Sequence, residues 1–577
     1  MSSTAIAIGV VIAIIAYGVG VFILSHRASK TINGNNEEFF VGGRGVGYAQ
    51  LIGTMIMSLM SVVILVGYPP NVYRLGIGYW SGKIGCFMLG GIYLVTTYRL
   101  WLLSGKYHYV TPVDFFAHRY NSKGYGYLAA AVFVICIIPY ISVQVSGVAA
   151  FITSSTSGKI GYWVVALVFL AYVLFHTIWG GNKSVTQTDA LAGYVAVAVV
   201  LTLVLVISIK ALGGTPMAEV VATIKAGPKA DVFTVIDPYN TTLGILGLTL
   251  AVGGSVLTWP HFMQRAFMAK NEKVMHTSAV AIPLAYLLIE AGIYFLDIYV
   301  APYVFPNWTS AEAEALTSNL INEFAPGLAI LACLGVFAFA MSTADSFAVT
   351  ATSLVQSNIL HTPIDKQVKN SKIWLCLIMF VVLIVTYFQP PILVTYAYQF
   401  SAPGFAQLMP ALFFGLFWKR ANKKGALAGL AAGFAMVVYT NFIDNPFGLH
   451  VILCGLFANI IVFVIVSLLT KPDEKAYHEI LEPLKRHFAT RKSTSHKVWI
   501  VYTTLCYLSV FFVLPYLPDT MVGGWLPVVV IAQISYAVLF AISAFWYGKI
   551  RLYEKDGSTK ELDIPDRYEW KPESANK

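Results

Sequence analysis

Apolar runs long enough to cross a membrane recur along the whole chain. A bilayer core about 30 Å thick needs about 20 apolar residues in a helix. Backbone groups in lipid must be hydrogen-bonded internally, and continuous rather than alternating runs favour helices over a β-barrel. We therefore predict an all-α polytopic membrane protein with about fifteen spans. They lie at roughly 4–26, 47–67, 78–103, 126–153, 162–180, 187–211, 243–264, 275–300, 326–358, 373–389, 392–417, 424–442, 449–469, 497–516 and 526–547.

Charged residues are scarce and unevenly distributed. Of the 577 residues, 57% are hydrophobic and 11% are charged, against about 25% charged in soluble domains. Most of the 38 Lys and Arg residues fall in segments that alternate onto one side of the predicted spans. This bias places the N-terminus outside and the C-terminus in the cytoplasm, as in a multi-pass protein of the cell membrane. Topology thus explains the net charge of +10, and we predict no nucleic-acid partner.

The apolar segment 326–359 is interrupted by one cluster of polar residues, namely Ser342, Thr343, Asp345 and Ser346. Such groups are costly in hydrocarbon and by default face the bundle interior, a wet cavity or an ion. Three of the four share one helix face. Hydroxyl and carboxylate oxygens suit a hard cation such as Na⁺. In the alternative interpretation, the hydroxyls only bond back to carbonyls one turn earlier.

Two other spans carry signs of a broken helix. Span 47–67 has Ser61 near its middle, and span 243–264 has Gly253 and Gly254. Helices interrupted at corresponding positions of two halves indicate an inverted repeat with its binding site at the interface between the halves. Counting from these spans gives two repeats of five helices with opposite topology.

This interpretation divides the chain into six parts. They are an N-terminal extra helix with its cytoplasmic linker (1–46), the first five-helix repeat (47–211), an extracellular loop (212–242), the second repeat (243–417), four additional helices with a basic cytoplasmic loop (418–547) and a cytoplasmic tail (548–577).

Three polar residues in other spans have two interpretations each. Gln144 either binds solute or cross-links helices. Asp189 either lines an ion path or stabilises a helix N-terminus. Glu290 is deep enough to need a partner or a proton, so it is either a structural acid or a coupling residue.

The sequence lacks the features that are expected of several other functional classes. The six cysteines form no CxxC or Cys/His ligand set, so they indicate core residues rather than a metal site or disulfides. A channel needs a repeated filter or pore ring, an enzyme a catalytic dyad, and a sensor an attached signalling domain. We predict no enzymatic activity and no organic cofactor. The oligomeric state stays open.

Four motifs occur together in one order, namely FFVGGR, WGG…TDALAG, PHFMQRAFMAKN and AMSTADS. In this respect the chain resembles the sodium/solute symporter family over roughly residues 35–440. The resemblance implies a fold of five plus five inverted helices and coupling of solute uptake to Na⁺.

The resemblance also implies a cation site. Its ligands would be the hydroxyls of Ser342 and Thr343, the carbonyl of Phe339, and span-two carbonyls near Met57 and Met60.

Further roles follow from the same resemblance. Ser61 matches a family serine near solute and ion, and Asp189 matches an acid of the cytoplasmic ion path. Leu59 stands where proline-transporting members have aspartate, which argues against proline. The runs TPVDFFAHRY (111–120) and PYISVQVSG (139–147) look like the branch that carries small monocarboxylates and pantothenate.

The expected function is Na⁺-coupled symport of a small organic solute, a monocarboxylate, by alternating access. The solute would bind near Ser61, Gln144 and the Gly253–Gly254 break. The alternatives are uptake of pantothenate, an amino acid or a sugar, or proton coupling through Glu290 or Asp345. A channel or membrane sensor is the alternative class.

Overall fold

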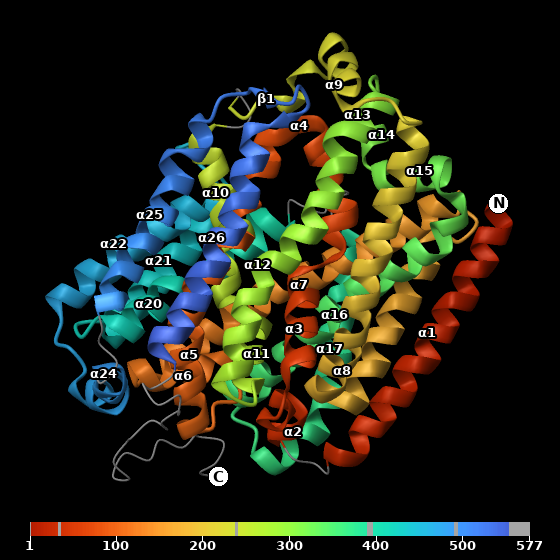
Figure 1. Cartoon of the computed structure of the whole chain (residues 1–577). Helices are drawn as coiled ribbons and strands as arrows, with labels where there is room; N and C mark the ends of the chain where they lie inside the picture. Colours follow the sequence, from red (N-terminus) through yellow and green to blue (C-terminus); the bar gives the residue numbers. More distant parts are fainter. Residues whose placement is uncertain (1, 33–35, 237–240, 389–395, 490–493, 553–577) are drawn as a thin grey trace.

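The computed structural model describes residues 2–32, 36–236, 241–388, 396–489 and 494–552. Apart from a small hairpin of β1 (Met521–Val522) and β2 (Leu526–Pro527), the described chain is a helical bundle (Figure 1). Twelve of the described helices are long and apolar enough to cross a membrane, or thirteen if one bent pair counts as a span. Most of the predicted tail, from residue 553 on, lies outside the described residues.

The helices that form or flank the spans are α1 (Ser3–Ile32), α3 (Tyr48–Leu59), α5 (Ile84–Tyr107), α7 (Lys123–Ser155), α8 (Tyr162–Leu212), α10 (Thr242–Val252), α11 (Pro260–Met268), α12 (Glu272–Phe295), α16 (Ala329–Leu354), α17 (Ile364–Phe388), α19 (Ala402–Ala406), α20 (Met409–Phe417), α21 (Lys423–Phe442), α22 (Val451–Leu469), α25 (Thr494–Phe512) and α26 (Val528–Arg551). Short helices connect them: α2 (Asn36–Val41), α4 (Pro69–Ser81), α6 (Pro112–Tyr120), α9 (Met217–Ala226), α13 (Ala301–Val304), α14 (Ser310–Ala313), α15 (Leu316–Phe324), α23 (Glu474–Ala476) and α24 (Glu482–Ala489).

The helix α8 accounts for part of the difference from the predicted fifteen spans. It is 51 residues long, or about 76 Å at 1.5 Å per residue, far more than one bilayer core. Gly181 divides it with φ 50° and ψ −157°. A Cβ at Gly181 would lie 2.6 Å from the carbonyl oxygen of Phe39, so only glycine fits this bend. Counting α8 as two spans and adding α25 gives fifteen, and that number stays a prediction.

Both expected helix interruptions are present. The helix α3 ends at Leu59, Met60 is extended with φ −91° and ψ 103°, and a π-helical turn follows at Val63–Gly67. The second interruption separates α10 from α11, which are bent by 44°. A 3₁₀ turn and the extended residue Trp259 join α10 to α11.

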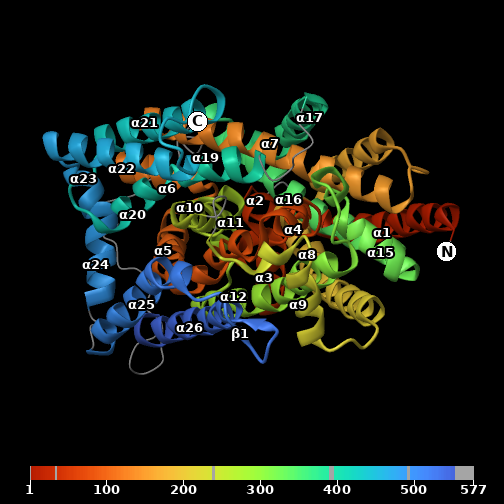
Figure 2. The same ribbon diagram turned by 90° about the horizontal axis from the view of Figure 1, so that it is seen from above.

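The interrupted helices lie near the centre of the bundle, together with α16. Figure 2 shows α3, α11 and α16 enclosed by other helices, with α21 and α22 at one edge and α25 and α26 at another. The N-terminal helix α1 packs on α8 and α16 and exposes most of its other apolar side chains. The start of α1 and the end of α26 lie at opposite ends of the bundle (Figure 1).

Two basic residues that lie near the ends of predicted spans are buried. The pattern of spans puts Lys83 at a span edge and Arg265 in a cytoplasmic loop, but each is only 2% exposed. The helix α11 continues to Met268 inside the bundle, and the chain turns at Gly82–Lys83 between α4 and α5. Each cation can be buried because a carboxylate pairs with it.

Close packing of Gly253 gives a prediction about stability. A Cβ at Gly253 would lie 1.8 Å from the carbonyl carbon of Gly85, which is backbone and cannot rotate away. Gly253→Ala should therefore destabilise the protein by about 1–3 kcal/mol or more, measured as a lower midpoint of thermal unfolding in detergent. The matched control is Gly254→Ala, where the nearest atom belongs to the flexible Leu250 side chain at 3.1 Å. Equal midpoints for the two variants would contradict this packing.

Candidate ion and solute site

One buried guanidinium connects four elements at the centre of the bundle. Arg265 of α11 donates from Nε to Thr54 Oγ1 of α3 at 2.7 Å. Its terminal nitrogen Nη2 donates to Asp189 Oδ2 of α8 at 2.8 Å and to Ser346 Oγ of α16 at 2.7 Å. Thr54 in turn donates to the same Asp189 oxygen at 2.7 Å. We call these four residues the Arg265 bridge.

The Arg265 bridge fixes α3 beside α16. The two helices run in opposite directions and both contact the bridge, at Thr54 and at Ser346. One turn from Thr54, towards the interruption of α3, lies Met57. One turn from Ser346, in the same spatial direction, lie Ser342 and Thr343. The predicted ion ligands of the two helices are thus brought to one level of the bundle.

The hydroxyl groups of α16 differ in their partners. Ser346 Oγ donates to the Ser342 carbonyl at 2.7 Å, and Thr343 Oγ1 is 3.4 Å from the Phe339 carbonyl. The buried Ser342 hydroxyl makes no hydrogen bond of normal geometry to any described residue, although the Asp189 carboxylate is near enough to interact with it. Back-bonding to the helix therefore explains Ser346 and, weakly, Thr343, but it does not explain Ser342.

The interrupted end of α3 supplies carbonyl oxygens. The Met60 N–H bonds to Ile56 at 2.9 Å and closes the helix, and the carbonyls beyond that point lack intrahelical partners. Met57 and Met60 are among them. Together with the two hydroxyls of α16, these carbonyls would make an all-oxygen donor set, which suits Na⁺ and does not suit a soft metal.

Asp345 is held by a histidine that sequence reasoning missed. His176 Nδ1 of α8 bonds to Asp345 Oδ2, and His176 Nε2 lies 3.0 Å from Ser184 Oγ. The second carboxylate oxygen of Asp345 has no partner among the described residues. The signal that could have found His176 is its position as a titratable residue inside an apolar span.

The predicted solute residues lie at the two interruptions. Ser61 Oγ accepts from the Val63 N–H at 3.2 Å, and Gln144 Oε1 of α7 accepts from the Val62 N–H at 3.1 Å. Gln144 thus cross-links α7 to the first interruption in this structure, so a solute that takes these N–H groups must displace it. At the second interruption, Gly253 packs on α5, and Gly254 has more space.

Aromatic rings fill the space between the interruptions. Tyr140 lies 5.3 Å from Trp259 and 5.0 Å from Phe347, measured between ring centroids, and Phe405 stacks on Phe347 at 5.7 Å. Sequence reasoning did not select Trp259, Phe347 or Phe405, because aromatic residues are common in apolar spans. They offer an apolar surface for a solute that binds between α3 and α11.

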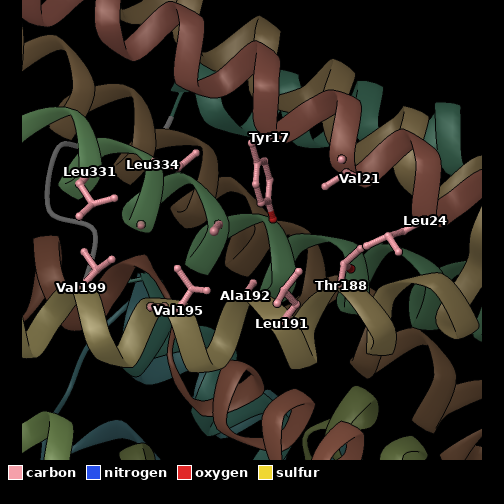
Figure 3. A pocket seen from close by; sticks show the side chains of 14 residues that line it. Tyr17, Val21, Leu24, Thr188, Leu191, Ala192, Val195, Val199, Leu331 and Leu334 are labelled. Atoms are coloured by element: carbon pink, nitrogen blue, oxygen red, sulfur yellow. The ribbon is translucent and has the colours of Figure 1, made fainter.

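An apolar cavity of about 210 Å³ lies elsewhere, between α1, α8 and α16 (Figure 3). Its walls include Val21, Leu191, Val195 and Leu331, and the Tyr17 ring points into it. None of the predicted ion or solute ligands lines this cavity. It therefore does not represent the candidate site.

Comparisons with known proteins agree on the type of protein. The family model described as "Sodium:solute symporter family" matches residues 39–433. An uncharacterized symporter of Bacillus subtilis, YodF, is 26% identical over 80% of this chain and 93% of its own length. The sodium/pantothenate symporter of Escherichia coli is 22% identical over 78% of this chain and 94% of its own length. Sodium/proline symporter 2 of Staphylococcus saprophyticus is 25% identical over 81% of this chain and 94% of its own length.

A solved structure shares the fold. The substrate-bound outward-open state of a Na⁺-coupled sialic acid symporter aligns with a TM-score of 0.67 and 17% identity, over 80% of this chain and 98% of that one. The architecture predicted from the two interrupted helices is thus confirmed. Together with the apolar helices, these matches identify a multi-pass protein of the cell membrane. The chain belongs to the sodium:solute symporter family.

Proposed function

We propose that the protein couples the inward movement of Na⁺ to the uptake of a small monocarboxylate by alternating access. The observation that carries this proposal is the Ser342 hydroxyl, which makes no hydrogen bond of normal geometry to any described residue and which the Arg265 bridge holds level with the interrupted end of α3. Na⁺ would bind to Ser342, Thr343 and the carbonyls of Phe339, Met57 and Met60. Bound there, it would join α3 to α16 and stabilise one conformation of the bundle.

The membrane potential would drive this coupling when more Na⁺ charges than carboxylate charges move inward, because one Na⁺ with one carboxylate carries no net charge. Each net positive charge moving inward gains about 2.3 kcal/mol per 100 mV, or roughly 45-fold in accumulation. Asp189 would line the path by which Na⁺ leaves. Since Arg265 and Thr54 hold Asp189 in this structure, the opening of that path requires these bonds to rearrange.

The solute carboxylate would bind at the first interruption. The N–H groups of Val62 and Val63 begin the second half of the broken helix, where backbone donors favour an anion. The solute would displace Gln144 and Ser61 from these groups and place its carbon chain against the rings of Tyr140 and Phe347. Pantothenate and proline, which name two of the relatives, also carry a carboxylate.

Uptake into proteoliposomes tests the proposal. Labelled pyruvate, lactate, acetate and pantothenate are each offered with and without an inward Na⁺ gradient at constant pH. We expect one of the monocarboxylates to accumulate only with the gradient. Accumulation of pantothenate alone would transfer the assignment to that solute, and uptake driven by a proton gradient without Na⁺ would contradict Na⁺ coupling.

A further inference from the structure

A second group of charges lies near the interruption between α10 and α11, apart from the Arg265 bridge. Lys83 precedes α5, Glu290 belongs to α12, and Asp297 lies in the π-helical turn Leu296–Val300 that continues α12. Lys83 Nζ is 2.7 Å from Glu290 Oε2. The three residues are 2%, 0% and 3% exposed, respectively. We call them the Lys83 cluster.

The position of the Lys83 cluster connects it to the transport core. Two residues after Lys83, Gly85 packs on Gly253 of the second interruption, and Cys86 Sγ donates to the carbonyl of Val252 at 3.5 Å. On the other side, the Lys83 ammonium lies 3.7 Å from the centre of the Tyr68 ring, just after the first interruption. A change of charge in the cluster would therefore act between the two interrupted helices.

The cluster contains two carboxylates and only one cation. Lys83 pairs with one oxygen of Glu290, and the other oxygen, Oε1, has no hydrogen-bond partner among the described residues. Asp297 interacts with the charges of Lys83 and Glu290 but makes no hydrogen bond within the described chain. With both acids ionised, one negative charge would remain uncompensated inside the membrane, at a cost of several kcal/mol.

The surrounding titratable groups do not supply the missing positive charge. Among the described residues, the other titratable groups that interact with the cluster are Tyr68, Cys86, Tyr286 and Tyr398, none of which can carry a positive charge. Tyr79 interacts in turn with Tyr68. Arg74, which interacts with Tyr79, is already paired with Glu314 at 2.7 Å. A metal ion is disfavoured because it would bind beside the Lys83 ammonium. The described residues also contain no group of three or more His, Cys, Asp or Glu side chains that could hold a metal.

We propose that Asp297, the buried acid left without a cation because Lys83 pairs with Glu290, binds one proton that balances the charge of the Lys83 cluster. The proton would exchange through Asp297, which lies at the end of α12 that leads to α13 and retains a small exposed fraction. The protein would thus have a proton site separate from the candidate Na⁺ site on α3 and α16. This inference does not depend on the identity of the solute.

Infrared spectroscopy of the purified full-length protein in lipid nanodiscs tests the proton directly. The quantity measured at neutral pH is the carbonyl-stretch intensity of protonated carboxylic acids, compared between wild type and variants. Asp297→Asn and Glu290→Gln should each lose one protonated carboxyl, because the first variant removes the protonated acid and the second frees Lys83 to pair with an ionised Asp297. Lys83→Met should gain one, because both acids must then be neutral.

Controls separate the cluster from other acids. Glu314→Gln, which removes a partly exposed acid on the protein surface, should leave the intensity unchanged. Any contribution from Asp189 or Asp345 is common to all the variants and cancels in the difference. If Lys83→Met does not fold, the two acid variants, Asp297→Asn and Glu290→Gln, still test whether the cluster holds a proton.

An unchanged intensity in both Asp297→Asn and Glu290→Gln would overturn the proposal. The outcome is distinguishable from that of the proposed function, since the infrared measurement uses neither Na⁺ nor solute.

Discussion

Replacing Ser342 and Thr343 together with alanine is expected to lower the apparent affinity for Na⁺ by about 30-fold or more. The double variant removes two hydroxyl ligands from the candidate site, and about 1 kcal/mol for each lost interaction corresponds to that factor. The carbonyls of Phe339, Met57 and Met60 remain, so uptake should persist at high Na⁺ with a reduced rate. The measurement is the initial rate of solute uptake into proteoliposomes as a function of external Na⁺.

A matched pair on the same helix provides the control. Thr352 and Ser353 are also buried hydroxyl residues of α16, but both bond back to carbonyls of their own helix, at 2.8 Å and 2.7 Å. Thr352→Ala with Ser353→Ala should leave the Na⁺ affinity near that of wild type. An unchanged Na⁺ affinity in the Ser342/Thr343 double variant would remove these residues from the ion site.

The second large effect is expected at the Arg265 bridge. Arg265→Met leaves the Asp189 carboxylate buried without its cation and with Thr54 as its remaining donor in the bridge. Removing one partner of a buried ion pair costs about 3–5 kcal/mol. We expect a marked fall in the midpoint of thermal unfolding in detergent, together with loss of transport, because α3 and α16 are no longer held in register.

A double variant that removes both charges separates the structural role of Asp189 from its role in the ion path. Asp189→Asn with Arg265→Gln removes both charges and keeps the possibility of hydrogen bonds, so stability should recover largely. If Asp189 also serves the ion path, Na⁺-driven turnover should stay slow after stability has recovered. Full recovery of turnover would assign Asp189 to structure alone. A single Asp189→Asn variant should slow turnover more than it weakens Na⁺ binding, and unchanged transport would remove Asp189 from the path.

Features that depend on residues close together along the chain were predictable from the sequence. The apolar spans, the interruption at Met60 and Ser61, and the interruption at Gly253 and Gly254 all follow from local composition. The polar cluster from Ser342 to Ser346 could be placed on one face because a helix has a fixed period. The inverted-repeat fold was predictable as well, because it follows from the order and spacing of the two interrupted helices along the chain.

Which buried side chains pair with each other across the bundle was not predictable in this way. Asp189 and Arg265 are 76 residues apart, His176 and Asp345 are 169 apart, and Lys83 and Glu290 are 207 apart. Hydropathy shows that a charge lies within or near a span, but the side chain it meets depends on how the helices are rotated and packed. The sequence by itself thus determined the spans, the broken helices and the cluster of hydroxyl and carboxyl groups on α16. Only the tertiary structure decided which buried charges are paired, because each pair joins helices whose contact is set by packing across the whole bundle.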